Sequence, residues 1–228
     1  MEFTLKIVIF APHPDDESYG AGGSILTWIN EGHNVHIIWL TDGRAGYRKP
    51  RIIGDLEDCE ATRISEDELV KIRLAEADAA GEFLGVKKEN RHFLKFFDQE
   101  LRKHIEEAVD EIKDILEDAD RFVIPSANND HPDHQATYEI AVKVAEELNL
   151  KSLEFYIYAL YNPLKAQDEN LVKIRIGNLR FKVYDALKLH KSQFYTKDMK
   201  WQSLAIRDRR RERFGSFKLK DKNNFYNF

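Results

Sequence analysis

The fold of this chain is decided by the stretch Leu5-Lys6-Ile7-Val8-Ile9-Phe10-Ala11-Pro12-His13-Pro14-Asp15-Asp16-Glu17. Its first half is a strongly apolar run with one lysine, which predicts a buried β-strand. Its second half gathers an imidazole and three carboxyl groups directly after that strand. Because binding sites in open α/β sheets lie beyond the carboxyl ends of the strands, this junction is a candidate functional site.

Strands and helices alternate along the rest of the chain, and this alternation predicts the α/β class. The expected further strands lie at 35–40, 91–95, 122–124, 154–159 and 171–176. The expected helices lie at 24–31, 66–84, 101–116, 134–148 and 184–194. We therefore expect a Rossmann-like, mostly parallel sheet with helices on both faces. The polar segment 41–66 is long for a loop, so we expect it to shape the pocket.

A second cluster of imidazoles and a carboxylate, His131-Pro132-Asp133-His134, follows the short apolar strand expected at 122–124. A catalytic zinc ion usually has three His or Asp/Glu ligands and one open position. His13 and Asp16 are three residues apart, so a tight turn can aim both at one point, and one histidine of the second motif would complete the set. Such a site can activate water and polarise a carbonyl oxygen, which indicates metal-assisted hydrolysis of an amide or ester.

The remaining groups of the two motifs have the chemistry of an acid–base pair. Asp15 lies beside Asp16 in the sequence and can take the proton of an attacking water molecule. Whichever of His131 and His134 is not a ligand can donate a proton or a hydrogen bond to the oxyanion. Asp133 can hold an imidazole in one tautomer. Phosphoryl transfer is less favoured, because it usually needs two metal ions or several basic groups.

The two motifs resemble the signatures of the LmbE/PIG-L family of metal-dependent N-deacetylases, which read (A/P)-H-P-D-D-E and H-P-D-H. Further matches follow in order: Thr41-Asp42-Gly43, then Arg73, Glu76, Ala80, Leu84 and Gly85, then His190-Lys191-Ser192-Gln193. The likeness covers about residues 5–195. One departure is Pro12, which replaces the commoner alanine and should stiffen the loop without altering a ligand.

This resemblance implies the fold and the role of each matched residue. The implied ligands of one zinc ion are His13, Asp16 and His134. The implied catalytic residues are Asp15 as general base and His131, oriented by Asp133, as the group that stabilises the oxyanion. The substrate-binding residues that we expect are Arg73, Asp42, Arg44 and His190. The implied reaction removes the N-acetyl group from an N-acetylglucosamine-containing small molecule or glycoconjugate.

Composition supports one globular domain. The chain has 228 residues, of which 43% are hydrophobic, and we expect a single domain over 1–228 with a C-terminal helix and an aromatic tail from about 196. The formal net charge of −5 argues against a general nucleic-acid binder. The single cysteine, Cys59, favours a reducing, cytoplasmic compartment. The sequence shows neither an apolar run of 18 residues nor a signal-peptide pattern.

Two alternative functions keep the same scaffold: an amidase acting on a thiol-sugar conjugate, and a non-catalytic sugar-binding or metal-binding protein. Dinucleotide binding is disfavoured, because the glycines of Gly20-Ala21-Gly22-Gly23 lack the required spacing and Pro12 to Tyr19 intervene. The expected partner is an N-acetylated amino sugar, without nucleic acid or a membrane span, and the family resemblance favours a homo-oligomer. Other metals could replace zinc, since affinity alone does not select it.

The end of the chain carries two further features. The basic run Arg207–Arg213 is typical of a solvated helix face. Aromatic residues follow it, at Phe214, Phe217, Phe225, Tyr226 and Phe228. Because disordered tails avoid aromatic residues, we expect this one to dock on its own core or on a neighbouring chain.

Overall fold

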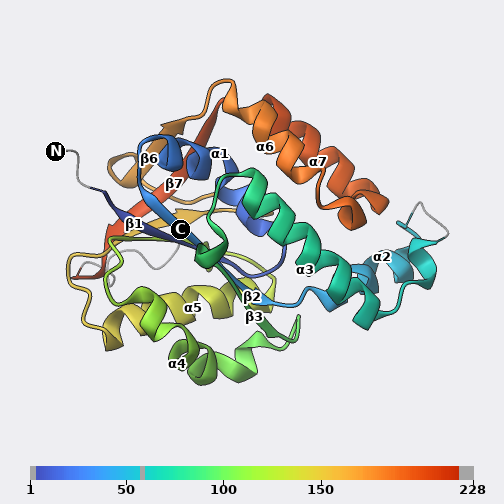
Figure 1. Cartoon of the computed structure of the whole chain (residues 1–228), viewed down its shortest axis with the longest axis horizontal. Helices are drawn as coiled ribbons and strands as arrows, with labels where there is room; N and C mark the ends of the chain where they lie inside the picture. The colour runs from blue at the N-terminus through green and yellow to red at the C-terminus, as the bar shows by residue number, and fades with distance from the viewer. Residues whose placement is uncertain (1–3, 57–59, 221–228) are drawn as a thin grey trace.

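The structure, a computed structural model, describes residues 4–56 and 60–220. In this part of the chain seven strands form one sheet, in the order β3-β2-β1-β4-β5-β7-β6 (Figure 1). The strands are β1 Lys6–Ala11, β2 Asn34–Thr41, β3 Arg91–Phe96, β4 Arg121–Pro125, β5 Glu154–Tyr158, β6 Leu171–Arg175 and β7 Arg211–Lys218. β1 to β5 pair in parallel, whereas β7 is antiparallel to both of its neighbours. The predicted mostly parallel α/β fold is confirmed.

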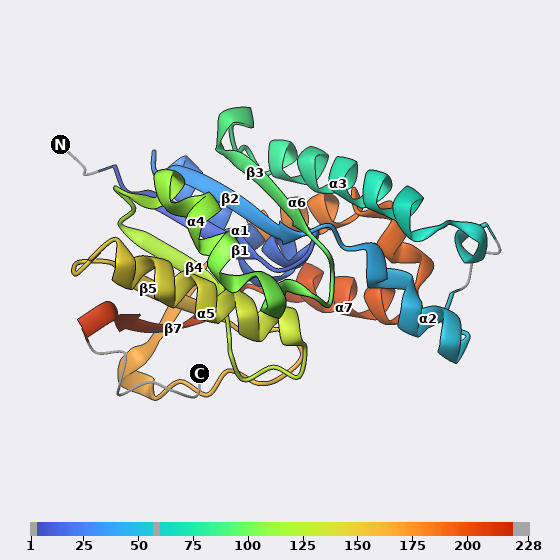
Figure 2. The same ribbon diagram turned by 90° about the horizontal axis from the view of Figure 1, so that it is seen from below.

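Helices cover both faces of the sheet, as expected. They are α1 Asp16–Asn30, α2 Arg48–Ile53, α3 Glu66–Phe83, α4 Ile105–Leu116, α5 Pro132–Glu147, α6 Leu179–Leu187 and α7 Lys197–Asp208. One face packs against α4 and α5, which lie on the near side of the sheet in Figure 2. The other face packs against α1, α3, α6 and α7. The strands are therefore shielded on both sides, which explains their continuous apolar sequences.

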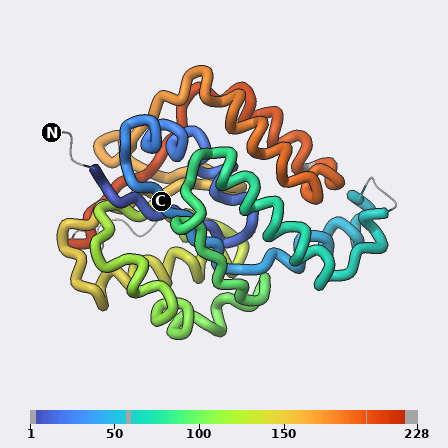
Figure 3. The backbone as a smooth tube through the Cα atoms, viewed as in Figure 1, coloured from blue at the N-terminus to red at the C-terminus, as the bar shows by residue number. Residues whose placement is uncertain are grey.

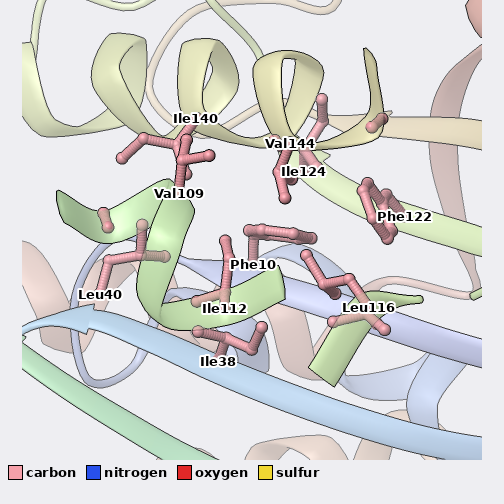
Figure 4. Packing of buried hydrophobic residues seen from close by; sticks show 14 of the residues in the cluster. Phe10, Ile38, Leu40, Val109, Ile112, Leu116, Phe122, Ile124, Ile140 and Val144 are labelled. Carbon is pink, nitrogen blue, oxygen red and sulfur yellow. The ribbon is translucent and has the colours of Figure 1, made fainter. Parts of the chain in front are cut away.

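The core is built from the alternating faces of the central strands. In β1, Ile7 and Ile9 face the α1 side, while Val8 and Phe10 face the α4 side, and all four are fully buried. Phe10 packs on Phe122 of β4 with ring centroids 4.9 Å apart (Figure 4). Burial of each large apolar side chain contributes about 1.5–3 kcal/mol. This packing fixes the strand ends, from which the candidate site residues extend.

The first helix begins earlier than the sequence suggested. We expected Gly20, Gly22 and Gly23 to open a helix that runs through Ser24 to Glu31, but α1 begins at Asp16. The glycines lie within the helix because other elements pack directly on it. A Cβ atom on Gly23 would lie 2.5 Å from Cγ2 of Ile176, and one on Gly20 would lie 2.6 Å from the Tyr158 ring. As a result, Asp16 lies in the first turn of a rigid, buried helix.

Three boundaries also differ from the sequence expectations. The helix expected at 101–116 starts with a 3₁₀ turn over Leu101–His104 before α4. The helix expected at 184–194 is α6, which ends at Leu187. The basic run is not one helix face, because α7 ends at Asp208 and β7 begins at Arg211.

The aromatic residues of β7 dock on the chain's own core, since Phe214 and Phe217 are buried. In the same strand Glu212 is buried and accepts hydrogen bonds from the backbone of Gly23 and Ser24 in α1. The expected strands did not include β7, because the basic run Arg207–Arg213, which overlaps its start, was interpreted as a helix face. Cys59, Phe225, Tyr226 and Phe228 lie outside the described residues.

Candidate active site

The candidate site lies at the carboxyl edge of the sheet, where the loops after β1, β2, β3 and β4 meet. The loop after β1 is tied to β2 by the Thr41 hydroxyl, which donates to the Pro12 carbonyl at 2.7 Å. The segment after β2 runs through a 3₁₀ turn, Arg44–Tyr47, and then forms α2 at one end of the molecule (Figure 3). Asp15 precedes α1 with φ 138°, a backbone conformation that is strained for a non-glycine residue.

The structure brings the three predicted metal ligands together. Asp16 Oδ2 lies 2.9 Å from His13 Nδ1 and 3.4 Å from His134 Nε2. All three side chains are buried, and one nitrogen or oxygen atom from each lies within 4.8 Å of the others. His134 is placed by α5, whose N-cap is His131, so the second motif forms the first turn of that helix. Two imidazole nitrogens and a carboxylate oxygen are a donor set that suits zinc.

Two observations show that these residues fit a cation. Nε2 of His134 is fully buried without a hydrogen-bond partner, and burial lowers the pKa of this imidazole to about 4, so the ring is neutral. Burial opposes ionisation of Asp16, but His134 and His13 lower its pKa to about 2. A buried polar atom that lacks a partner is costly unless something binds it. A divalent cation would satisfy both groups.

The other nitrogen of His13 faces two more carboxylates. His13 Nε2 lies 3.3 Å from Asp133 Oδ2 and 3.3 Å from Asp98 Oδ1. Burial lowers the pKa of His13, but Asp98, Asp133 and Asp16 together raise it well above its usual value. Without a metal ion the ring is therefore protonated on both nitrogens. A cation at the site would replace the proton on Nδ1, while the carboxylates of Asp98 and Asp133 would keep the proton on Nε2. A carboxylate that holds a ligand imidazole in this way strengthens metal binding.

The carboxylate of Asp133 therefore contacts His13, whereas the resemblance implied that it orients His131. Its two carboxylate oxygens also accept hydrogen bonds from the backbone nitrogens of Gln99 and Leu101, at 2.6 and 3.2 Å. A second group of potential ligands, His13, Asp98, His131 and Asp133, lies at the same place. The set with Asp16 and His134 includes a buried ring nitrogen, Nε2 of His134, that has no hydrogen-bond partner, and it is the set that the family resemblance implies.

Asp15 lies beside the ligands with the electrostatics of a general base. Burial raises its pKa to about 7, although Arg73 opposes the shift. One oxygen of Asp15 lies 3.2 Å from the Arg73 guanidinium. A carboxyl group with a pKa near 7 can both accept and release a proton at neutral pH. A cation bound nearby would lower this pKa again.

Arg73 is not directed toward open solvent. Its guanidinium donates to the carbonyl oxygens of Gly43 and Pro14, at 2.8 Å each, and the side chain is 4% exposed. It therefore fastens the loop after β2 to the loop after β1 and holds Asp15. The expected contact between Arg73 and a substrate stays a prediction beside this internal role. Gly43, with φ 69°, leaves room for the guanidinium, because a Cβ atom there would lie 2.7 Å from Nη1.

His131 has the properties of a neutral hydrogen-bond donor. Its Nδ1 accepts a hydrogen bond from the backbone nitrogen of Asp133 at 3.3 Å, so its proton lies on Nε2. Burial and His13 lower its pKa, which keeps the ring neutral. The ring stands edge-on to His13, with centroids 4.6 Å apart. This position beside the metal ligands suits a donor to an oxyanion.

A profile of the PIG-L family, GlcNAc-PI de-N-acetylase, matches residues 8–145 of this chain. The chain belongs to the PIG-L family. It is 31% identical to the probable N-acetyl-alpha-D-glucosaminyl L-malate deacetylase 2 of Bacillus anthracis over 240 residues, which cover 98% of this chain and 100% of that protein. It is 25% identical over 177 residues to the 1D-myo-inositol 2-acetamido-2-deoxy-alpha-D-glucopyranoside deacetylase of Mycobacterium sp. strain KMS. That match covers 68% of this chain and 54% of the relative, so the chain spans about half of the mycobacterial protein.

A solved structure shares the fold of this PIG-L family member. The N,N'-diacetylchitobiose deacetylase from Pyrococcus horikoshii superposes with a TM-score of 0.72 and 23% sequence identity. The superposition covers 95% of this chain and 85% of that one. No helix of the described residues is long and apolar enough to cross a membrane.

The three other residues expected at the pocket, Asp42, Arg44 and His190, lie in different surroundings. Asp42 is buried, and its Oδ2 accepts a hydrogen bond from Nε of Arg44 at 2.8 Å. Arg44 is half-buried at the edge, with its guanidinium 3.8 Å from the centre of the Phe97 ring. His190 is 1% exposed and its Nε2 lies 3.3 Å from Glu17 Oε1, behind the loop that carries Asp15. His190 therefore supports that loop from the protein interior and does not line the pocket as we expected.

Sequence reasoning missed two residues at this site. Asp98 lies two residues after the end of β3. Its position as an acidic residue just beyond a predicted strand is a signal that could have identified it. Tyr161, in the loop after β5, stands edge-on to His134 with ring centroids 5.9 Å apart. A tyrosine three residues beyond a strand carries no comparable signal in the sequence.

Proposed function

We propose that this chain is a metal-dependent hydrolase that removes the acetyl group from an N-acetylglucosaminide. The single observation that carries the proposal is the convergence of His13, Asp16 and His134 next to Asp15, whose pKa is raised by burial to about 7. We infer zinc as the metal, held by those three ligands. When bound there, a zinc ion supplies a Lewis acid that polarises the acyl carbonyl and activates water.

The residues of the chain supply the proton transfers. Asp15 takes a proton from the water that attacks the acyl carbon, and Arg73 holds Asp15 in place for this step. His131 donates Nε2–H to the carbonyl oxygen as negative charge develops on it. The carbon–nitrogen bond then breaks, and the proton held by Asp15 passes to the leaving nitrogen. The products are acetate and a free amino sugar.

The first substrate to test is N-acetyl-α-D-glucosaminyl L-malate. The malate deacetylase of Bacillus anthracis matches this chain over nearly the full length of both proteins, whereas the mycobacterial inositol enzyme is matched over about half. The substrate of that inositol enzyme is the second candidate. Diacetylchitobiose is the third, because the chitobiose deacetylase has the same fold. Selection among these three substrates depends on the protein groups that bind the part of the substrate beyond the amino sugar.

The test is acetate release from these three compounds and from N-acetylglucosamine, with added zinc and with a chelator. We expect chelator-sensitive acetate from one of them and its loss in Asp15→Asn. A thiol-sugar conjugate belongs in the same assay, since release of an amine plus a mercapturate would instead identify an amidase. Tight sugar binding without any product would identify a binding protein and contradict the proposal.

We further propose one domain over residues 1–228, a homo-oligomer and a cytoplasmic location. The single sheet supports the domain, because it takes strands from residue 6 to residue 218. The single cysteine supports a reducing compartment. Light scattering of the purified protein measures its oligomeric state, and fractionation of cells measures its location.

A further inference from the structure

Tyr161 forms the centre of a strained turn in the loop after β5. Its φ is 70°, in the left-handed region that bulky side chains rarely adopt. The backbone nitrogen of Asn162 donates to the carbonyl oxygen of Leu160 at 2.9 Å, which closes a three-residue γ-turn around Tyr161. A γ-turn with positive φ is the rarer and more strained form. A glycine would adopt it at little cost, so the tyrosine side chain needs another explanation.

The turn is fastened to the loop of the second motif. The Asn129 side chain donates to the Leu160 carbonyl at 3.1 Å, and the Asn162 side chain donates to the Asn128 carbonyl at 3.1 Å. Asn129 also accepts a hydrogen bond from the His131 backbone and lies 3.2 Å from His134 Nδ1. Strained backbone persists only where its surroundings hold it, and such residues cluster at functional sites. The same amide thus holds both the turn and a predicted metal ligand.

This arrangement presents the Tyr161 ring beside the metal ligands. The ring stands at 63° to the ring of His134, yet the residue is 67% exposed. The ring adds little to the core. It is an open aromatic surface next to the reacting centre.

We propose that Tyr161 contacts the substrate, and that its exposed ring packs against the sugar ring of the N-acetylated substrate. The C–H groups on one side of a pyranose ring form an apolar surface that suits an aromatic face. In this role Tyr161 determines substrate affinity and takes no part in proton transfer. The inference rests on the proposed function, because it assumes that the ligand of the site is an amino sugar.

The experiment replaces Tyr161 by glycine and by phenylalanine. Tyr161→Gly removes the ring and relieves the turn, so we expect a KM at least about tenfold higher, a nearly unchanged kcat and full metal content. The thermal midpoint should not fall, and relief of strain should raise it by about 2 °C. Tyr161→Phe keeps the ring and should leave KM within about threefold of the original value.

The matched control is Asn149→Gly. Asn149 also has positive φ, 54°, but lies just after α5 and away from the site. This variant should gain stability in the same way, with KM and kcat unchanged. A rise in KM for Tyr161→Gly alone would separate a substrate contact from a general effect of glycine.

A binding measurement separates this inference from the proposed function. The Kd of N-acetyl-α-D-glucosaminyl L-malate and of N-acetylglucosamine is measured by calorimetry in the zinc-loaded Asp15→Asn protein, with and without Tyr161→Gly. A Kd at least about tenfold weaker without the ring supports the contact even if the chain releases no acetate. An unchanged Kd and KM, or an absence of binding by either sugar, would overturn the inference, whereas acetate release alone decides the proposed function.

Discussion

Asp15 combines the geometry and the pKa of a general base, because it lies beside the metal ligands and is held by Arg73. We expect Asp15→Asn to retain the metal ligands His13, Asp16 and His134 but to lower kcat by roughly 10²–10⁴-fold. The amide has nearly the same volume and cannot accept the proton. Metal analysis and an assay of acetate release on one preparation measure the metal content and kcat of the variant. More than a tenth of the original kcat with normal metal content would refute the assignment.

Arg73 joins two loops, so its removal should affect catalysis and stability together. Arg73→Ala leaves Asp15 without its cation and two buried carbonyl groups without donors, which should cost about 3–5 kcal/mol and lower kcat. The control is Arg91→Ala, since Arg91 is also buried, paired with Asp78, and lies at the other end of β3. That variant should lose stability at unchanged kcat. A higher KM with unchanged kcat and stability for Arg73→Ala would instead indicate that Arg73 contacts the substrate directly.

Helix α1 positions Asp16, and its glycines allow other elements to approach. Alanine normally favours a helix over glycine by about 1 kcal/mol. At Gly23 the opposite should hold, because the new Cβ atom would meet Ile176 at 2.5 Å. We expect Gly23→Ala to destabilise the protein by about 1–3 kcal/mol, which thermal unfolding measures. Ile176→Ala in the same chain should recover part of the loss; a stabilised Gly23→Ala variant would contradict the packing argument.

The same helix shows how far the sequence alone could predict an element. The apolar runs of β1, β2 and β4 were sufficient to place the central strands, because burial on both faces requires continuous apolar sequence. The start of α1 was placed too late in the sequence, because the first motif was interpreted as a loop, whereas α1 begins within that motif at Asp16. β7 was missed because its partners, β5 and β6, are distant in the chain.

At the scale of the whole molecule, the site residues could be predicted where they lie together in short sequence motifs. The two motifs and the family resemblance indicated His13, Asp16 and His134 as ligands, and the structure brings these three together. Partnerships across loops were not predictable: Asp133 holds His13, and His190 holds Glu17. Each depends on which loops meet at the sheet edge, and only the packed sheet determines that.

The opposite end of the sheet gives the molecule an acid-sensitive pair. His36 of β2 and His92 of β3 stack, with His36 Nδ1 3.2 Å from His92 Nε2. Burial, His92 and Lys6 lower the pKa of His36 to about 4, despite the opposing charges of Asp118 and Glu89. Burial and Lys6 also lower the pKa of His92, while the Asn34 side chain contacts His36 Nε2. Both rings are therefore neutral in the folded protein near pH 7.

Unfolding raises the pKa of His36 to about 6.5, so the unfolded chain binds the extra proton between pH 6.5 and 4. Stability from this group is therefore complete above pH 6.5 and is lost as the pH falls toward 4, by up to roughly 3 kcal/mol. His36→Gln should reduce this loss, because glutamine can keep a hydrogen bond and does not titrate. Urea unfolding at pH 7.5, 5.5 and 4.5 measures the difference, with His104→Gln on the exposed start of α4 as control. Equal pH dependence in the original chain and His36→Gln would show that the pair does not make the fold acid-sensitive.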